Sequence, residues 1–148
     1  MNTKRELTNI IKASITLFVI LICFACSNDD DSSSEPTTMQ LLTADKWYME
    51  SSTLIIMTEC RKQTWVQFLE NEVLVGEGFY TDVNDNCISN PLATATWQLL
   101  GNSEFTITSN GETLLYTIIS MSEDELTVSA ELDGETQIYV YDKNPGNG

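Results

Sequence analysis

Short segments in which apolar and polar residues alternate follow one another along the chain from about Trp47 onward. A period of two places successive side chains on opposite faces of a β-strand, so each segment predicts a strand with one buried face. Turns rich in Gly, Asn, Asp and Ser separate eight such segments. The predicted strands cover residues 47–57, 63–69, 73–80, 93–100, 104–108, 113–120, 125–131 and 136–142.

The connections between these segments carry their own signals. Asn110-Gly111 and Asp133-Gly134 favour tight two-residue hairpin turns with positive φ. Gly76 and Gly78 fall within one strand and indicate a bend, a bulge or close packing. The mostly polar segment Asp82–Pro91 is expected to be a long loop.

Eight sequential strands joined by short turns predict an all-β domain with an antiparallel meander. Closing such a meander into an up-and-down barrel removes its two open edges. An eight-stranded barrel has an interior just wide enough for packed side chains or one small ligand. A β-sandwich is the alternative, but its Greek-key crossings need longer connections than the turns of the C-terminal half.

The first 25 residues have a different character from the predicted domain. Lys4, Arg5 and Lys12 precede the uncharged, mostly apolar run of residues 13–25. A helix of that length spans about 20 Å, short of the roughly 30 Å hydrocarbon core of a bilayer. A secretory signal peptide is therefore favoured over a transmembrane anchor.

The end of this apolar run resembles the lipobox of bacterial lipoproteins, because Cys26 follows the small residue Ala25. The resemblance implies cleavage before Cys26, acylation of this cysteine and anchoring to the lipid bilayer. The acidic run Ser27–Asp31 resembles the export signal that sends some lipoproteins to the outer face of the outer membrane. A solvated spacer is the alternative. We expect an outer-membrane, lipid-anchored protein at the cell surface or on the periplasmic face.

Between the lipobox and the strands the chain has little to bury. Residues 28–38 contain no large apolar side chain and are expected to form a flexible tether. Thr37 or Thr38 would cap a short helical turn over residues 39–44. The expected organisation is a signal peptide at 1–25, a lipidated cysteine and tether at 26–38, a barrel domain at 39–143 and a tail at 144–148.

Several features of the domain resemble the lipocalin-like domains of bacterial lipoproteins. They are Leu41-Leu42-Thr43 before Trp47, a cysteine beside Arg61, a tryptophan-containing strand before Gly101, and a C-terminal meander. The resemblance covers residues 41–142 and implies a barrel. Asp45-Lys46-Trp47 stands where lipocalins carry Gly-x-Trp.

Composition excludes several classes of function. The chain has no histidine, 22 acidic residues, 7 basic residues and a net charge of −15, which becomes −17 in the 123 residues left after cleavage. Without imidazole, Ser-His-Asp and Cys-His catalysis and histidine-containing metal sites are excluded. The acidic excess argues against nucleic acid, whose binding requires Lys and Arg. No cofactor is implied.

Cys60 and Cys87 are the two cysteines left in the domain after export. An even pair in an oxidising compartment predicts a disulfide. Two thiols without histidine would make an incomplete zinc site, so metal binding by this pair is disfavoured.

Other candidate chemistry has ordinary alternatives. Asp82-x-Asn84-x-Asn86 has the spacing of the first three EF-hand ligands but lacks the loop glycine and the final glutamate. Asp and Asn are also common turn residues. Carboxylates such as Glu70 and Glu72 could form a hydrolytic pair, but with so many acids some lie close by chance. We expect no enzyme.

Aromatic and aliphatic residues on the strands supply the predicted ligand site. We expect a small apolar cavity inside the barrel, lined by Trp47, Trp97, Phe105, Tyr116 and Ile138. The alternative is that these residues form a filled barrel core. The favoured function is non-catalytic binding of a small hydrophobic molecule in the cell envelope. The other hypothesis is a structural or interaction module whose acidic exterior docks a basic or glycan-associated envelope partner.

Overall fold

The computed structural model describes residues 35–92 and 94–146 of the chain. The predicted signal peptide and the lipidation site at Cys26 lie outside the described residues. Within them the α-helix is α2 (Thr38–Thr43) and a 3-10 turn is η1 (Arg61–Gln63). The strands are β1 (Trp47–Ser52), β2 (Trp65–Phe68), β3 (Val73–Thr81), β4 (Cys87–Pro91), β5 (Ala95–Leu100), β6 (Glu104–Ser109), β7 (Glu112–Met121), β8 (Glu125–Leu132) and β9 (Glu135–Asp142).

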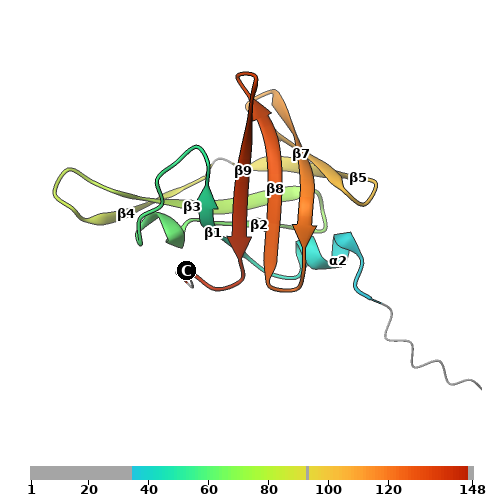
Figure 1. Ribbon diagram of the computed structural model, residues 1–148, viewed down its shortest axis with the longest axis horizontal. Coiled ribbons are helices and arrows are strands. Elements are labelled where there is room, and N and C mark those ends of the chain that lie inside the picture. The colour runs from blue at the N-terminus through green and yellow to red at the C-terminus, as the bar shows by residue number, and fades with distance from the viewer. Residues whose placement is uncertain (1–34, 93, 147–148) are drawn as a thin grey trace, which may run out of the picture. The chain divides into compact units, whose positions relative to one another are not determined.

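Eight of these strands form a closed antiparallel barrel (Figure 1). Neighbours follow the order β1-β9-β8-β7-β6-β5-β3-β2, and pairing of β2 with β1 closes the ring. The predicted all-β barrel is confirmed, and the sandwich alternative is excluded because each of the eight strands has two partners. Closure gives every strand of the ring a partner on both sides, although β1 with β2 and β3 with β5 share only two paired positions each.

Strand β4 lies outside the ring and corrects one prediction, since the segment Asp82–Pro91 was expected to be a loop. β4 pairs with the last five residues of β3, from Glu77 to Thr81. All five residues of β4 are exposed, so the strand shows no alternation of apolar and polar positions. Backbone pairing across the β3–β4 hairpin, rather than burial of side chains, therefore forms this strand.

Strand β1 also ends earlier than predicted, at Ser52 instead of Met57. Thr53 marks the end of the pairing: its N–H donates to the carbonyl of Ile138 at 3.0 Å, and its Oγ1 accepts the N–H of Ile138 at 2.9 Å. The apolar residues that follow leave the barrel wall as an irregular loop. Their sequence predicts a strand because β-branched residues are typical of sheets.

The two hairpin turns predicted from dipeptides are confirmed. Asn110-Gly111 joins β6 to β7 with φ values of 53° and 84°, and Asp133-Gly134 joins β8 to β9 with 54° and 81°. Positive φ at both central residues matches the right-handed twist of paired strands.

Helix α2 packs near β2 at one end of the barrel. Thr37 caps it, because the Thr37 side chain accepts the N–H of Gln40 and the Gln40 side chain accepts the N–H of Thr37. This capping box satisfies backbone donors that the first turn leaves free. The helix buries Leu42 completely, and the predicted helical turn is confirmed.

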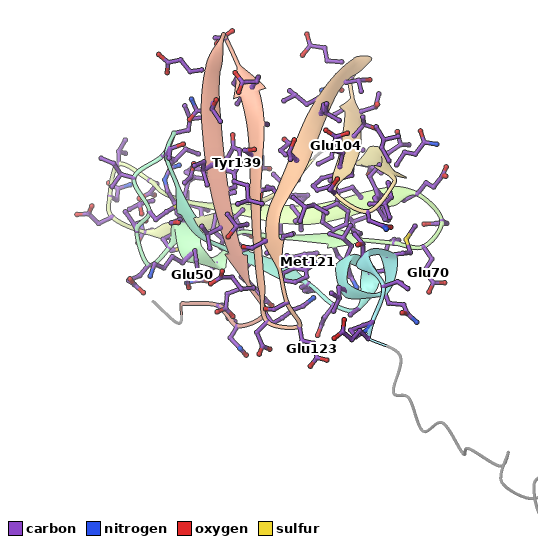
Figure 2. All side chains as sticks on the ribbon, turned by 45° about the vertical axis from the view of Figure 1, so that its right-hand side comes forward. Glu50, Glu70, Glu104, Met121, Glu123 and Tyr139 are labelled. Carbon is purple, nitrogen blue, oxygen red and sulfur yellow. A yellow bond between two sulfur atoms is a disulfide. The ribbon has the colours of Figure 1, made fainter. Side chains whose placement is uncertain are left out.

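The barrel interior is filled by inward-facing side chains (Figure 2). The fully packed cluster comprises Leu42, Trp47, Phe68, Leu74, Ala95, Trp97, Phe105, Leu126, Val128, Ala130 and Tyr139. In the same view Glu70 and Glu123 lie at the periphery. None of the helices in the described residues is long and apolar enough to cross a membrane.

Candidate functional site

Three of the residues predicted to line an internal pocket fill the barrel instead. Trp47, Trp97 and Phe105 are at most 3% exposed. Phe68 contacts the rings of Trp97 and Phe105 edge-on, with centroids 5.0 and 5.3 Å apart. Such aromatic packing occupies the space that a ligand would need. Of the alternatives, the structure favours a filled core at these positions.

Both buried indole groups also bind backbone carbonyls at the helical end of the barrel. Trp47 Nε1 donates to Leu42 O at 3.0 Å, and Trp97 Nε1 donates to Leu69 O at 2.9 Å. The Nζ of Lys143 lies 3.4 Å from the centroid of the Trp47 ring. Burial lowers the pKa of Lys143, while Asp45 and Asp124 act in the opposite direction. These contacts give the two tryptophans a structural role.

Tyr116 and Ile138 take different positions. Tyr116 is half-buried and stacks on Phe105 with ring centroids 5.2 Å apart. Ile138 is 37% exposed, because the inward positions of β9 are Gln137, Tyr139 and Tyr141. Its assignment to an internal pocket was wrong: alternation identifies which residues share a face, but it does not say which face is buried.

Tyr116, Tyr139 and Tyr141 form a cluster of phenols on the inner side of β7 and β9. Burial raises the pKa of Tyr116, and the neighbouring Tyr139 raises it further. Burial also raises the pKa of Tyr139, and the pKa of Tyr141 is raised by burial and then by the other two phenols. All three side chains therefore remain neutral at physiological pH.

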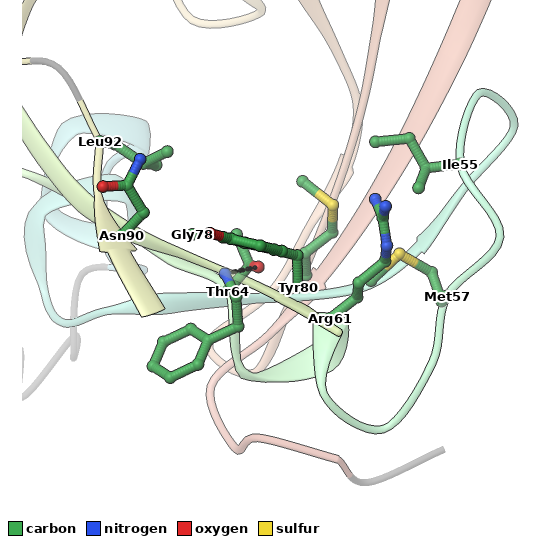
Figure 3. A pocket seen from close by; sticks show the side chains of 10 residues that line it. Ile55, Met57, Arg61, Thr64, Gly78, Tyr80, Asn90 and Leu92 are labelled. Atoms are coloured by element: carbon green, nitrogen blue, oxygen red, sulfur yellow. Dashed lines mark hydrogen bonds between the residues drawn. The ribbon is translucent and has the colours of Figure 1, made fainter. Parts of the chain in front are cut away.

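A cavity of about 280 Å³ opens at the other end of the barrel, where β1 ends and β2 begins. We call it the mouth cavity (Figure 3). It is lined by Met49, Ile55, Met57, Arg61, Thr64, Gly78, Phe79, Tyr80, Asn90 and Leu92. None of these ten is among the five residues predicted from the sequence. The cavity is mainly apolar, and its volume lies near the lower limit of small-molecule sites.

Strand register explains why these residues meet. Trp47 pairs with Val66, and Val66 pairs with Gly76, so these three positions share the inward face. Two residues further along β1 and β3, Met49 and Gly78 also face inward and form the floor of the cavity. Figure 3 places Arg61, Ile55 and Met57 on one side and Leu92 and Asn90 on the other, with Tyr80 between them.

Two glycines make room for this arrangement. A Cβ atom at Gly76 would lie 2.5 Å from the Trp65 carbonyl oxygen and 2.9 Å from Leu92 Cδ1, and one at Gly78 would lie 3.2 Å from Leu92 Cδ2. The predicted alternative of close packing at Gly76 and Gly78 is therefore confirmed. Their lack of side chains lets Leu92 lie across β3 at the mouth.

The predicted disulfide between Cys60 and Cys87 is confirmed, with Cα atoms 5.5 Å apart. Cys60 directly precedes the cavity residue Arg61, and Cys87 begins β4. The bond thus joins the loop after β1 to the β3–β4 hairpin. These two segments carry opposite walls of the mouth cavity.

Residues 82–86, whose spacing matches the first three ligands of an EF-hand loop, form a turn. Asp82 Oδ1 accepts the N–H groups of Asn84 and Asn86, each at 2.8 Å. These backbone hydrogen bonds, that of Asn86 first, lower the pKa of Asp82. The carboxylate closes the tip of the β3–β4 hairpin, and the described residues contain no cluster of three or more acidic or thiol ligands that could hold a metal.

Two further cavities lie elsewhere on the described surface. The larger, about 490 Å³, includes the outward-facing Tyr48 and Trp65 and the exposed Glu59. The other, about 260 Å³, lies over β7 and β8. The mouth cavity is the best candidate site, because it combines an inward-facing floor with an apolar lining.

A closed eight-stranded barrel, with a helix at one end and a cavity at the other, defines a lipocalin-like architecture. Comparison with protein families agrees. Residues 43–128 match the family described as lipocalin-like domain, and the chain belongs to this family.

Solved structures share the fold at low sequence identity. Japanin from Rhipicephalus appendiculatus bound to cholesterol is 10% identical, with a TM-score of 0.54 over 73% of this chain and 79% of that one. Aphrodisin, a sex pheromone from female hamster, is 16% identical, with a TM-score of 0.38 over 67% of this chain and 73% of that one. The similarity to Japanin supports the fold alone, and the similarity to aphrodisin is too weak to support a structural conclusion. No curated protein sequence matches the chain.

One feature of the sequence indicates the mouth cavity, although it was predicted to be part of the first strand. The run Leu54–Met57 is apolar, ends near a cysteine and carries no alternation. Ile55 and Met57 from this run line the cavity, while Ile56 between them is 88% exposed. This four-residue apolar run beyond the end of a strand therefore supplies part of the cavity wall.

Proposed function

We propose that this protein binds a small hydrophobic molecule, without chemistry, in the mouth cavity of its barrel. The observation that carries the proposal is the apolar cavity with an inward-facing floor in a domain of the lipocalin-like family. The barrel interior beneath it is packed, so the ligand would occupy the mouth rather than the centre. Binding of a small hydrophobic molecule is thus still the proposed function, but the proposed site is the mouth cavity and no longer the barrel interior.

The rim of the cavity supports this proposal. Two of the residues that line the cavity, Tyr80 and Leu92, are large apolar side chains that are also exposed to solvent. Exposed apolar side chains at the opening of a cavity are typical of sites where apolar ligands approach. The cholesterol held by Japanin indicates that this type of barrel accommodates apolar molecules.

The polar lining supports binding without catalysis. Arg61, Thr64 and Asn90 supply the polar side chains apart from the Tyr80 hydroxyl, and none of the described residues that line the cavity carries a carboxylate. Hydrolysis by carboxylates needs two such groups at a defined separation. The site therefore offers apolar contact and a few fixed polar groups, which suits recognition.

Binding is tested with an uncharged dye, N-phenyl-1-naphthylamine, whose fluorescence rises in apolar surroundings. Replacing Ile55 with Ser is expected to weaken dye binding roughly tenfold, because it removes apolar contact from the cavity wall. Ile56→Ser is the matched control: the neighbouring side chain points into solvent, so its replacement is expected to leave the affinity unchanged. If the dye does not bind the wild-type protein, or if it binds both variants equally, the assignment of ligand binding to the mouth cavity is wrong.

We further propose that Cys26 is acylated and anchors the domain to the outer membrane of a bacterial envelope. The support is the lipobox-like sequence Ala25-Cys26 after an uncharged apolar run. In cells fed a fatty-acid probe, the wild-type protein should be labelled and Cys26→Ala should not. Labelling of the Cys26→Ala variant at wild-type level would refute the assignment. Protease treatment of intact cells then separates surface display from the periplasmic face.

A further inference from the structure

Arg61 differs from the other basic residues of the described chain. Each of the others has a partner: Lys46 lies 3.7 Å from the Trp65 ring centroid, Lys143 lies 3.4 Å from that of Trp47, and Lys62 pairs with Glu50 at 3.1 Å. Within residues 35–92 and 94–146, the Arg61 guanidinium makes no ion pair and donates no hydrogen bond. It lines the mouth cavity instead.

Within the described residues Lys46 and Lys143 also form no ion pair, but each lies over an aromatic ring, whereas Arg61 has neither kind of partner. The adjacent Lys62 lies 3.1 Å from Glu50 and 4.0 Å from Glu59. Among the residues that the structure describes, no carboxylate pairs with Arg61, which lies beside Ile55 and Met57 (Figure 3). A guanidinium is weakly hydrated and keeps its charge in apolar surroundings, which an ammonium group does less readily.

The position of Arg61 is well defined. The backbone N–H of Arg61 donates to Thr58 Oγ1 at 3.2 Å, and the preceding residue, Cys60, is linked to β4 by the disulfide. Of the other polar side chains in the cavity, Thr64 already accepts the N–H of Phe79 through Oγ1 at 2.9 Å. The ten described residues of the lining include no carboxylate that would repel a negative ligand group.

We infer that Arg61 receives the acidic head group of the ligand. The bound molecule is then an amphipathic anion, with an apolar body in the mouth cavity and a carboxylate paired with the guanidinium. A carboxylate fits the planar guanidinium in a two-pronged, charge-assisted hydrogen bond. This inference rests on the proposed function and specifies the ligand class for the same site.

Two probes of equal chain length separate the charge from the apolar contact: decanoate and decan-1-ol, titrated at neutral pH below the concentration at which decanoate aggregates. Replacing Arg61 with Met is expected to weaken decanoate binding by about ten- to a hundredfold, because one charge-assisted hydrogen-bonded pair is lost. Decan-1-ol binding should be unchanged. Arg61→Lys should retain part of the affinity for decanoate.

Lys46→Gln is the control for charge, since it removes one positive charge away from the cavity and should affect neither probe. An equal loss for decanoate and decan-1-ol in Arg61→Met would assign Arg61 a structural role and overturn the inference. Unchanged decanoate affinity would overturn it too. If the wild-type protein binds neither decan-1-ol nor the uncharged dye, the proposed function itself fails, and the two failures are thereby distinguished.

Discussion

Replacing Phe105 with alanine is expected to destabilise the protein by about 3–5 kcal/mol, the usual cost of removing a large buried aromatic side chain. Phe105 is 2% exposed and lies between Phe68, 5.3 Å away, and the stacked ring of Tyr116, 5.2 Å away. The substitution removes both aromatic contacts and leaves a cavity in the centre of the barrel. Chemical denaturation, followed by tryptophan fluorescence, measures the loss.

The matched control is Ile119→Ala on the adjacent strand β7. Ile119 is 55% exposed, so its truncation is expected to change stability by no more than about 0.5 kcal/mol. Equal effects of the two substitutions would contradict the packed core. The Phe105→Ala variant also bears on the ligand site: if the dye binds at the mouth, its affinity should not depend on the removal of Phe105, provided the variant remains folded.

Loss of the Cys60–Cys87 disulfide is the second large effect, with an expected destabilisation of about 3.5 kcal/mol in the chain-entropy model. The bond closes a loop of 27 residues, and its removal gives that loop back its freedom in the unfolded state. In the folded state, the loop after β1 and the β3–β4 hairpin lose their covalent link. The Cys60→Ser/Cys87→Ser double variant should therefore show lower stability and weaker dye binding.

Reduction provides the control for this prediction. Dithiothreitol should lower the denaturation midpoint of the wild-type protein towards that of the double variant, and it should leave the double variant unchanged. A wild-type midpoint that is the same with and without reductant, despite complete reduction shown by mass spectrometry, would count against a stabilising role. Retention of full dye affinity after reduction would show that the mouth cavity keeps its shape without the bond.

Much of the fold was predictable because it depends on local patterns. The turns at Asn110-Gly111 and Asp133-Gly134 need positive φ at both positions, and these dipeptides favour it without help from the rest of the chain. Phe105 and Ile107 alternate with polar residues, as do Leu126 and Val128, so each pair is predicted to share a face, and both pairs face inward. Two cysteines in a domain expected to be exported were enough to predict a disulfide.

The errors have a common cause, which is that local patterns do not contain information about partners. Strand β4 has only exposed side chains and exists because β3 offers it backbone hydrogen bonds. Ile138 shares a face with Val140, as alternation predicts, but the neighbouring strands decide that this face is the outer one. The run after Ser52 has the composition of a strand, yet the described sheet has no place for it beyond Thr53.

By itself, the sequence determined the number of barrel strands, the hairpin turns, the disulfide and the types of side chain available for binding, because these follow from the period of the pattern and from residue chemistry. Only the tertiary structure decided where a ligand would fit. Trp47, Trp97 and Phe105 fill the centre of the barrel because closure brings their strands together. The mouth cavity is formed by residues far apart in the chain, such as Ile55 and Leu92, which line its opposite sides, and Gly78 lets Leu92 lie close to β3.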